Sequence, residues 1–343
     1  MFEDFHGNRP VQAALDQMLA SGRIAQTILL DGPEGVGKST LARRVAARLL
    51  GGASKIENDD LSLEHNRERI AEREKLPAEK RGEDPLLFST HPDFVTICPE
   101  GPLRQISIQQ MRQLRERAQY KPLKGAWRVF LIDQIDRANP QAADSLLKTL
   151  EEPPEHLMLI LTAENPYDLP ATIRSRSIPF RLVPLSDDEM QAFAQSRKID
   201  ESDRRLSLAA GCPGMAVTLD LAVYEKRRAT MMGLLEAASG AGGFGGWVKQ
   251  SESFIASKSE KLDLYFKTLY GLLEDLLFAL HGRPVLRNPD LRRELSGLAQ
   301  RIDFDWIRRA VKKTDELVEL QRRNVQKGLS LDRFVVTQRW ELE

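Results

Sequence analysis

The first half of the chain alternates between apolar runs and amphipathic segments. Over residues 9–24 apolar side chains recur at helical spacing (Val11, Leu15, Met18, Leu19), which predicts a helix. The run TILLDG predicts a short buried strand, and STLARRVAARLL after it an amphipathic helix. Strand patterns return in DFVTI, RVFLID and LMLILTA, separated by helical segments. Strands that alternate with helices predict an α/β fold with a parallel sheet covered on both faces.

Strand signals nearly vanish after Ser186. SDDEMQAFAQSRK begins with a good N-cap and an acidic first turn, which predicts a helix. Two shorter helical segments follow, interrupted by Gly211, Pro213 and Gly214, and from Tyr224 onward the pattern is one of long helices. The sequence therefore predicts a sheet domain over 1–183, a small helical domain over 184–225 and a helical bundle over 226–343.

The segment 51–85 breaks the alternation inside the first predicted domain. It is mostly charged and offers few apolar residues that could anchor it. We interpret it as a solvated helix or a flexible insertion, because such a composition buries little apolar surface.

Composition narrows the class of protein. Lys+Arg and Asp+Glu both number 50, so the formal net charge is zero and exerts no global attraction toward nucleic acid. No apolar run approaches the roughly 20 residues of a membrane span, and the N-terminus has no signal-peptide pattern. Cys98 and Cys212 are isolated thiols that make neither a disulfide framework nor a zinc site. These features predict a cytoplasmic protein without a membrane partner.

A complete phosphate-binding motif follows the first strand. Residues 32–39, GPEGVGKS, match G-x-x-x-x-G-K-[ST], and they lie between a predicted strand and a predicted helix. Successive backbone N–H groups form an anion nest, Lys38 reaches the β- and γ-phosphates, and the Ser39 hydroxyl binds Mg²⁺. The predicted nucleotide-binding residues are Gly32, Gly35, Val36, Gly37, Lys38, Ser39, Thr40 and Asp133.

The strand VFLIDQID supplies the second half of that site. Its apolar residues carry Asp133 to the C-terminal edge of the sheet, where Asp133 and Ser39 are expected to hold Mg²⁺. An ATPase would be expected to carry a glutamate next, but the chain has Gln134. A neutral amide cannot act as general base, and loss of a base costs about 10²–10⁴-fold in rate. Asp136 is the nearest substitute, although a surface or capping role fits it better.

The segment TIRSRS places Arg174 and Arg176 after the strand LMLILTA. An arginine there can face a neighbouring subunit and stabilise charge on a transferred phosphoryl group. Taken alone, the pattern fits an ordinary exposed, salt-bridging arginine better.

Together these residues resemble the clamp-loader branch of the AAA+ ATPases. The resemblance rests on GRIAQTILLDGPEGVGKSTLARRVAARLL, HPDF, DSLLKTLEEPPEHLMLILTAENPYDLPATIRSRS and AAGCPGMAV, and covers about residues 1–225. It implies an AAA+ P-loop domain, a small helical lid and a C-terminal collar. It also implies a hetero-pentamer with gamma/tau motor subunits and delta, which opens a sliding clamp and closes it on primed DNA. Arg176 would be the finger directed at a neighbour's ATP.

The chain departs from the family's pattern at several positions. The insertion lacks the four zinc-binding cysteines that related subunits often carry, so we predict no zinc. Ser177 replaces the usual cysteine after Arg176, which leaves the arginine chemistry unchanged. Gly214 lies where motor subunits usually have an arginine that contacts the γ-phosphate. The residue that senses the γ-phosphate from the end of LILTAEN stays open among Thr162 to Asn165.

Two functions therefore compete. The first is a non-motor clamp-loader subunit that binds ATP with Mg²⁺, hydrolyses it poorly and gives Arg176 to a neighbour. The alternative is an ATP-hydrolysing gamma/tau-type motor, which Lys38 and Ser39 favour and Gln134 and Gly214 oppose. An unrelated P-loop kinase or regulatory ATPase fits less well, because LLKTLEEPP with SRS is specific. The basic stretch RERAQYKPLKGAWR is interpreted as solvated surface, and direct contact with DNA stays open.

Overall fold

The computed structural model describes residues 2, 4–256, 262–283, 287–322 and 327–340. It contains two compact units: residues 1–199 with 211–215, and residues 200–210 with 216–343. The three domains expected from the sequence (1–183, 184–225 and 226–343) stay a prediction. Residues 257–261, 284–286, 323–326 and 341–343 of the third lie outside the described part.

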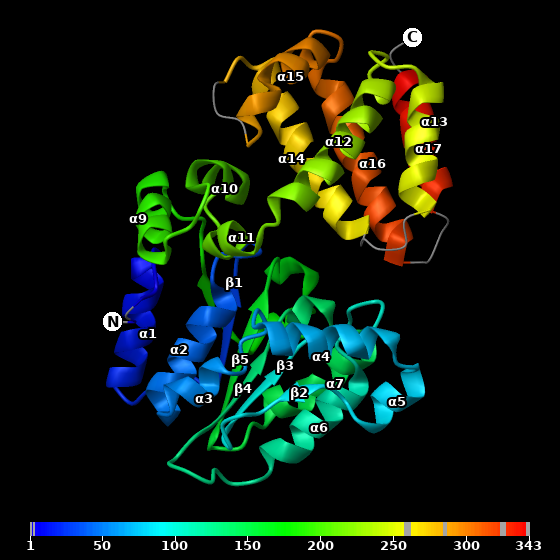
Figure 1. The fold of residues 1–343 in the computed structure, drawn as a ribbon. Coiled ribbons are helices and arrows are strands. Elements are labelled where there is room, and N and C mark those ends of the chain that lie inside the picture. Colours follow the sequence, from blue (N-terminus) through cyan, green and yellow to red (C-terminus); the bar gives the residue numbers. More distant parts are fainter. Residues whose placement is uncertain (1, 3, 257–261, 284–286, 323–326, 341–343) are drawn as a thin grey trace. The chain divides into compact units, whose positions relative to one another are not determined.

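A six-stranded sheet with strand order β2-β3-β4-β5-β1-β6 forms the centre of the first unit (Figure 1). The strands are β1 (Thr27–Asp31), β2 (Leu87–Phe88), β3 (Phe94–Ile97), β4 (Arg128–Ile132), β5 (Leu157–Ala163) and β6 (Ile178–Arg181). All paired strands run parallel except β2, which is antiparallel to β3. The predicted α/β fold with a parallel sheet is confirmed. The short strand β2 was not predicted, because two residues carry no readable alternation.

Alternate residues of the strands enter two separate cores. Leu29 and Phe130 pack with α6 (Ile108–Ala118) and α7 (Pro140–Glu151), whereas Ile28 and Leu131 pack with α1 (Arg9–Ala20) and α2 (Lys38–Leu50). The strands β1, β3, β4 and β5 are buried on both faces, which explains their continuous apolar runs. Because α2 starts directly after the loop that follows β1, the phosphate-binding motif lies at the C-terminal edge of the sheet.

The charged segment 51–85 forms the helices α3 (Ala53–Glu57), α4 (Glu64–Lys75) and α5 (Ala78–Glu83). Buried ionic contacts fasten it to the rest of the unit. Arg73 Nε donates to Glu100 Oε2 at 2.8 Å, with both side chains buried, and Arg43 Nε donates to Glu57 Oε2 at 3.0 Å. The segment is thus helical, as one of the two interpretations has it. It is held by ion pairs that its composition did not indicate.

The helices that follow the sheet are divided between the two units. In the first unit, α8 (Ala171–Ser175) precedes β6, and α9 (Asp187–Arg197) begins with the predicted cap: Ser186 and Glu189 form a reciprocal capping box. Helix α10 (Ser202–Ala209) belongs to the second unit, and α11 (Pro213–Thr218) spans the change from one unit to the other at residues 215 and 216.

In the described part of the second unit every regular element is helical. Beyond α10 it contains α12 (Leu221–Ala238), α13 (Phe244–Ala256), α14 (Leu262–Leu280), η3 (Pro289–Leu291), α15 (Arg292–Ala299), α16 (Phe304–Arg322) and α17 (Lys327–Trp340). One hydrophobic core contains the buried side chains of Trp247, Leu269 and Trp306. The predicted all-helical C-terminal region is confirmed as a fold; its collar role stays a prediction.

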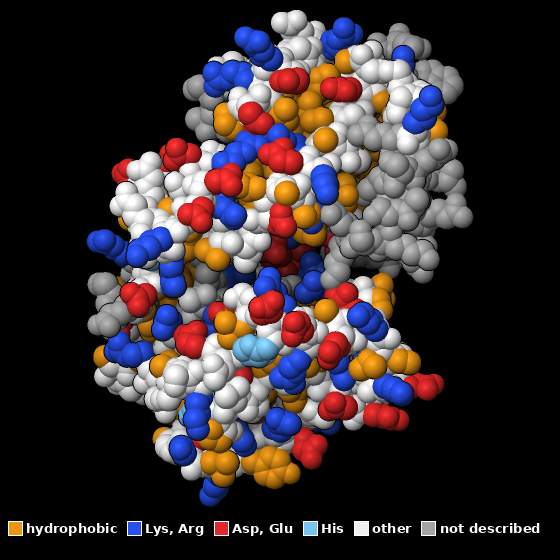
Figure 2. All heavy atoms as spheres, viewed as in Figure 1, with side chains coloured by type: hydrophobic (Ala, Val, Ile, Leu, Met, Phe, Trp, Pro, Cys, Tyr) orange, Lys and Arg blue, Asp and Glu red, His pale blue; other side chains and the backbone are white. Residues whose placement is uncertain are grey.

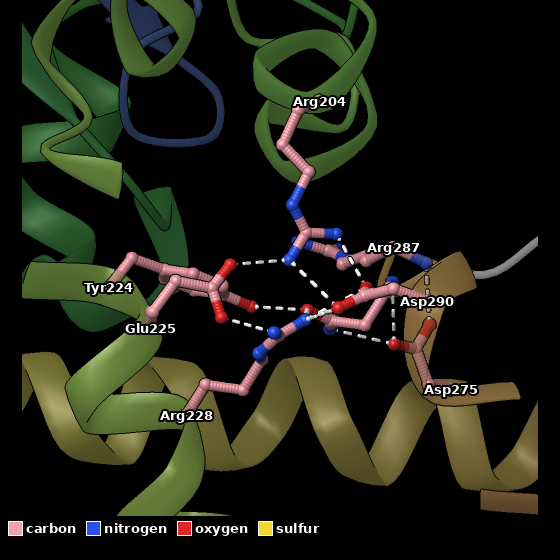
Figure 3. A network of polar contacts seen from close by, with 8 residues as sticks. Arg204, Tyr224, Glu225, Arg228, Asp275, Arg287 and Asp290 are labelled. Carbon is pink, nitrogen blue, oxygen red and sulfur yellow. Dashed lines mark hydrogen bonds and ion pairs between the residues drawn. The ribbon is translucent and has the colours of Figure 1, made fainter. Parts of the chain in front are cut away.

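A ring of alternating charges ties α10 to α12 and η3 (Figure 3). Arg204 donates to Glu225 and to Asp290, each at 2.7 Å, and Arg228 pairs with the same two carboxylates. Burial alone would raise the pKa of Asp290, but the hydrogen bonds and charges of Arg228 and Arg204 outweigh it and hold that pKa below its ordinary value. Arg228 also donates to the buried Asn288, so the ring continues into the interior.

Charges of both signs mingle on the molecular face shown in Figure 2, as the balanced composition leads one to expect. Within the described residues, no helix is both long and apolar enough to cross a bilayer.

Candidate nucleotide-binding site

The loop after β1 has the backbone of an anion-binding turn. Gly32, Gly35 and Gly37 all have positive φ values, of 146°, 76° and 107°. A Cβ at Gly32 would lie 2.3 Å from the Leu182 carbonyl oxygen, so only glycine fits there. Gly37 is the N-cap of α2, and Val36 is buried in the core beneath the loop. Thr40, in the first turn of α2, is partly buried.

Lys38 folds back on its own loop. Its ammonium donates to the carbonyl oxygens of Gly32 at 2.7 Å and Pro33 at 2.8 Å. Burial lowers the pKa of Lys38, and the carboxylates of Glu164 and Asp133 oppose that effect. A phosphate entering the loop would offer Lys38 a charged partner in place of two carbonyls.

Ser39 and Asp133 meet as the sequence predicts. The Ser39 hydroxyl donates to Asp133 Oδ1, and Thr162 Oγ1 donates to the same oxygen at 2.7 Å. A hydroxyl and a carboxylate are the hard oxygen ligands that Mg²⁺ takes beside nucleotide phosphates, so the donor set fits that ion. No cluster of three or more His, Cys, Asp or Glu side chains suited to a metal occurs among the described residues.

Gln134 has the left-handed backbone conformation, with φ 57° and ψ 54°. Its backbone N–H donates to Thr162 Oγ1 at 2.8 Å, which links the end of β4 to β5. A non-glycine residue in this region is strained, and such strain is common at functional sites. The backbone of Gln134 is therefore held in a defined conformation, but the side-chain amide of Gln134 cannot accept a proton as a general base would.

Gly214 lies directly against the phosphate loop. Its N–H donates to the Gly35 carbonyl at 2.8 Å, and a Cβ there would come within 2.9 Å of that oxygen. The neighbouring Met215 approaches Gly35 as closely, since a Cβ on Gly35 would lie 2.7 Å from Met215 Cγ. The position predicted to lack the sensor arginine is thus a close backbone contact, and no side chain fits there.

Two acidic residues complete the edge of the site. Asp136 Oδ2 accepts from the Glu164 backbone N–H at 3.1 Å, so Asp136 has a capping role, and burial raises its pKa. The negative charge of Glu164 opposes the lowering of the Lys38 pKa by burial. Asn165 instead accepts from the Tyr167 N–H and donates to Asp168 in a local turn.

Arg176 lies away from the phosphate loop. It immediately precedes Ser177 and β6, and β6 runs parallel to β1, whereas the loop follows the C-terminal end of β1. Arg176 is therefore at the opposite edge of the sheet, where its side chain is 36% exposed and pairs with Glu151 at 3.0 Å. Arg174 instead stacks on Tyr167, with its Cζ 5.2 Å from the ring centroid.

Comparison with known proteins shows what part of the chain is similar to. Residues 83–186 match the family described as DNA polymerase III, delta subunit. The chain is 30% identical over 190 residues to the tau subunit of DNA polymerase III from Escherichia coli K12, which covers 55% of this chain and 26% of tau. It is 31% identical over 201 residues to a gamma subunit from Buchnera aphidicola, covering 59% of this chain and 50% of gamma.

The chain thus spans half or less of the length of these two curated relatives. Among solved structures, a DNA polymerase III gamma subunit-related protein from Thermotoga maritima has a TM-score of 0.44 at 17% identity, over 96% of this chain and 99% of the other. The chain is thus similar to the DNA polymerase III delta-subunit family over residues 83–186, and over somewhat more than half of its length to proteins named tau and gamma subunits of DNA polymerase III.

Proposed function

We propose that this chain is the delta-prime type of clamp-loader subunit, which binds ATP in its own loop and serves catalysis mainly in a neighbouring subunit. The observation that carries the proposal is Gln134 at the end of β4, beside a Ser39–Asp133 pair that is otherwise complete. This pocket can hold a nucleotide and Mg²⁺ but lacks the usual proton acceptor.

The role of this chain in its complex would be to present Arg176. Its place at the edge opposite the phosphate loop excludes it from the chain's own nucleotide and leaves it exposed for another subunit. A guanidinium inserted beside the γ-phosphate stabilises the charge of the transition state. The proposed partners are gamma/tau motor subunits and delta. The complex would open the sliding clamp and close it on primed DNA.

A second candidate is a gamma/tau-type motor that hydrolyses ATP itself. The relatives support it more directly than the first candidate, because they are named gamma and tau subunits. The loop with Lys38 and Ser39 supports it too, whereas Gln134 and the backbone contact of Gly214 with Gly35 oppose it.

The deciding experiment measures ATP turnover by the purified full-length chain, alone and in a reconstituted loader, with and without the clamp. The proposal expects little turnover by the chain alone. It also expects Arg176→Ala to slow turnover by the complex about 10³-fold or more without preventing assembly. Fast clamp-stimulated turnover by the isolated chain would establish that it is an ATP-hydrolysing motor subunit instead. Unchanged turnover in the Arg176→Ala complex would rule out Arg176 as an arginine finger.

A further inference from the structure

The hydroxyl of one buried threonine joins the two residues that follow β4. Thr162 lies in β5 and is fully buried. Its Oγ1 donates to Asp133 Oδ1 at 2.7 Å and accepts from the Gln134 backbone N–H at 2.8 Å. A hydroxyl has a single proton to donate. The proton of Thr162 is therefore committed to Asp133, and this side chain serves the site through its two neighbours.

The sheet sets the position of this hydroxyl. Strands β4 and β5 run parallel with Ile132 opposite Leu161, so the next residues along them, Asp133 and Thr162, emerge as neighbours. On its other side Thr162 pairs with Leu30 of β1. A β-branched side chain is restricted about χ1, which narrows the directions that the hydroxyl can take. Its contact with Asp133 is thus built on paired strands rather than on a loop.

Burial alone does not give a threonine of this chain such contacts. Thr96 in β3 and Thr149 in α7 are also buried, yet their Oγ1 atoms have no hydrogen-bond partner among the described residues. The two bonds of Thr162 are therefore particular to its place beside Asp133. Thr96 lies in the strand on the other side of β4, so it offers a matched comparison within the same sheet.

One oxygen of Asp133 is held from two directions. Asp133 Oδ1 accepts from the Ser39 hydroxyl at the start of α2 as well as from Thr162 in β5. Ser39 is itself an expected ligand of Mg²⁺, whereas Thr162 has its proton on the carboxylate. Hydrogen bonds from groups outside the ligand set orient a metal-binding carboxylate, and their loss typically weakens metal binding. Thr162 supplies such a bond.

We propose that Thr162 is a positioning residue for the Mg²⁺–nucleotide complex, acting through Asp133 without touching the ion or the nucleotide. Its hydroxyl fixes the Asp133 carboxylate and, through the Gln134 N–H, the left-handed backbone that follows. The inference rests on the proposed binding of ATP with Mg²⁺ in this loop. It applies equally to a subunit that hydrolyses ATP poorly and to a motor, and it is independent of Arg176.

The test measures binding of a fluorescent ATP analogue to the full-length chain, with Mg²⁺ and with EDTA. A Mg²⁺ titration at fixed analogue concentration gives the Mg²⁺ concentration needed for half-maximal binding. Thr162→Val and Thr162→Ala both remove the hydroxyl, the first with little change of shape, and Thr162→Ser keeps it. Thr96→Val makes the same change at a hydroxyl that has no hydrogen bond. Thermal unfolding checks the fold of each variant.

We expect Thr162→Val and Thr162→Ala to raise the required Mg²⁺ concentration about 10–100-fold. Affinity in EDTA should stay unchanged, because Lys38 and the glycine loop bind the phosphates without the ion. Thr162→Ser should recover most of the wild-type Mg²⁺ dependence, and Thr96→Val should match the wild type. Added to Asp133→Ala, Thr162→Val should change the Mg²⁺ dependence no further, since the group through which Thr162 acts is gone.

The inference would be overturned if Thr162→Val and Thr162→Ala needed no more Mg²⁺ than Thr96→Val, with nucleotide binding itself left in place. Equal losses of affinity with Mg²⁺ and with EDTA would also overturn it, because Thr162 would then support only the fold of the pocket. Failure of the wild type to bind the analogue would overturn the proposed nucleotide pocket together with the inference. The finger role of Arg176 is decided separately, by ATP turnover of the complex.

Discussion

The exposed arginine at the sheet edge is held by the last residue of α7: Arg176 Nη2 donates to Glu151 Oε1 at 3.0 Å. Arg176 Nη1 also donates to the Thr172 carbonyl at 3.2 Å. A guanidinium has five N–H donors, so these two contacts leave donors available to a ligand from outside. A side chain held in this way loses less rotamer entropy when it docks than a free one would.

Removing the Glu151 carboxylate should modestly reduce the contribution of Arg176 to catalysis at the neighbouring ATP site. Exposed ion pairs contribute about 0.2–1 kcal/mol, so Glu151→Ala should lower kcat of the neighbouring ATP site by up to about fivefold. The KM for ATP should change less. Steady-state ATPase assays of the reconstituted complex measure both constants.

The controls separate orientation from general charge effects. Glu151→Gln retains an acceptor oxygen and should restore part of the rate, and Glu155→Ala, an equal charge change at an exposed residue, should leave it unchanged. Adding Glu151→Ala to Arg176→Ala should cost nothing further. A full additional loss in the double variant would show that Glu151 acts by another route.

The contact between Gly214 and Gly35 predicts intolerance of any side chain. In Gly214→Ala the new Cβ would lie 2.9 Å from the Gly35 carbonyl oxygen. Relieving this overlap should cost about 1–3 kcal/mol of stability and weaken nucleotide binding, because the loop itself must shift. Thermal unfolding and titration with a fluorescent nucleotide measure the two effects. Gly243→Ala, where a Cβ would meet nothing within 4 Å, is the matched control and should bind nucleotide normally.

Nucleotide binding should depend on the protonation of Lys38. Burial holds the pKa of Lys38 below its ordinary 10.5, and bound phosphates would raise it. Affinity should therefore be constant while Lys38 is protonated. Above the lowered pKa it should fall about tenfold per pH unit, with uptake of a proton on binding. Calorimetric titrations at alkaline pH, in buffers of different ionisation enthalpy, detect that proton. Lys38→Arg, which stays charged, should bind without this pH dependence.

The charge ring of the second unit should matter to its stability. Arg228→Ala removes one partner each from Glu225, Asn288 and Asp290 and should cost about 1–3 kcal/mol. Calorimetric unfolding of the full chain measures it, with Lys226→Ala, an exposed cation of the same helix, as the control. Because the pKa of Asp290 is lowered by folding, its stabilising effect is present above the unfolded value. It is lost as pH falls through the folded value. Asp290→Asn should remove that acid-range decline.

The parts of the site that the sequence predicted are contiguous or lie at strand ends. The loop around Lys38 is a single run of residues between a strand and a helix, and Asp133 directly follows the central strand β4. Parallel pairing brings strand ends to one edge, so Ser39 and Asp133 had to meet. The sensing residue, which the resemblance left open among Thr162 to Asn165, could not be chosen from the sequence, because the local turn that occupies Asn165 is visible only in the structure.

The contacts that escaped prediction join residues far apart in the chain. Arg73 and Glu100 each look like ordinary members of a solvated charged pattern, and only the packing of α4 pairs them in the interior. The backbone bond between Gly214 and Gly35 leaves no mark in periodicity or composition. Glu151 belongs to the run LEEPP. That run indicated a resemblance to a family, but nothing in the sequence indicated that Glu151 pairs with Arg176.

The path of the chain through the helices after the sheet sets a limit on any attempt to divide the protein. The chain passes from one compact unit to the other between residues 199 and 200, back between 210 and 211, and across again between 215 and 216. A fragment ending at Ile199 would lose the N–H that Gly214 gives to the Gly35 carbonyl. A fragment beginning at Asp200 would carry residues 211–215 without the loop they cover. No single cleavage point yields both halves whole, so limited proteolysis or truncation that appears to isolate the nucleotide domain will report on a damaged pocket.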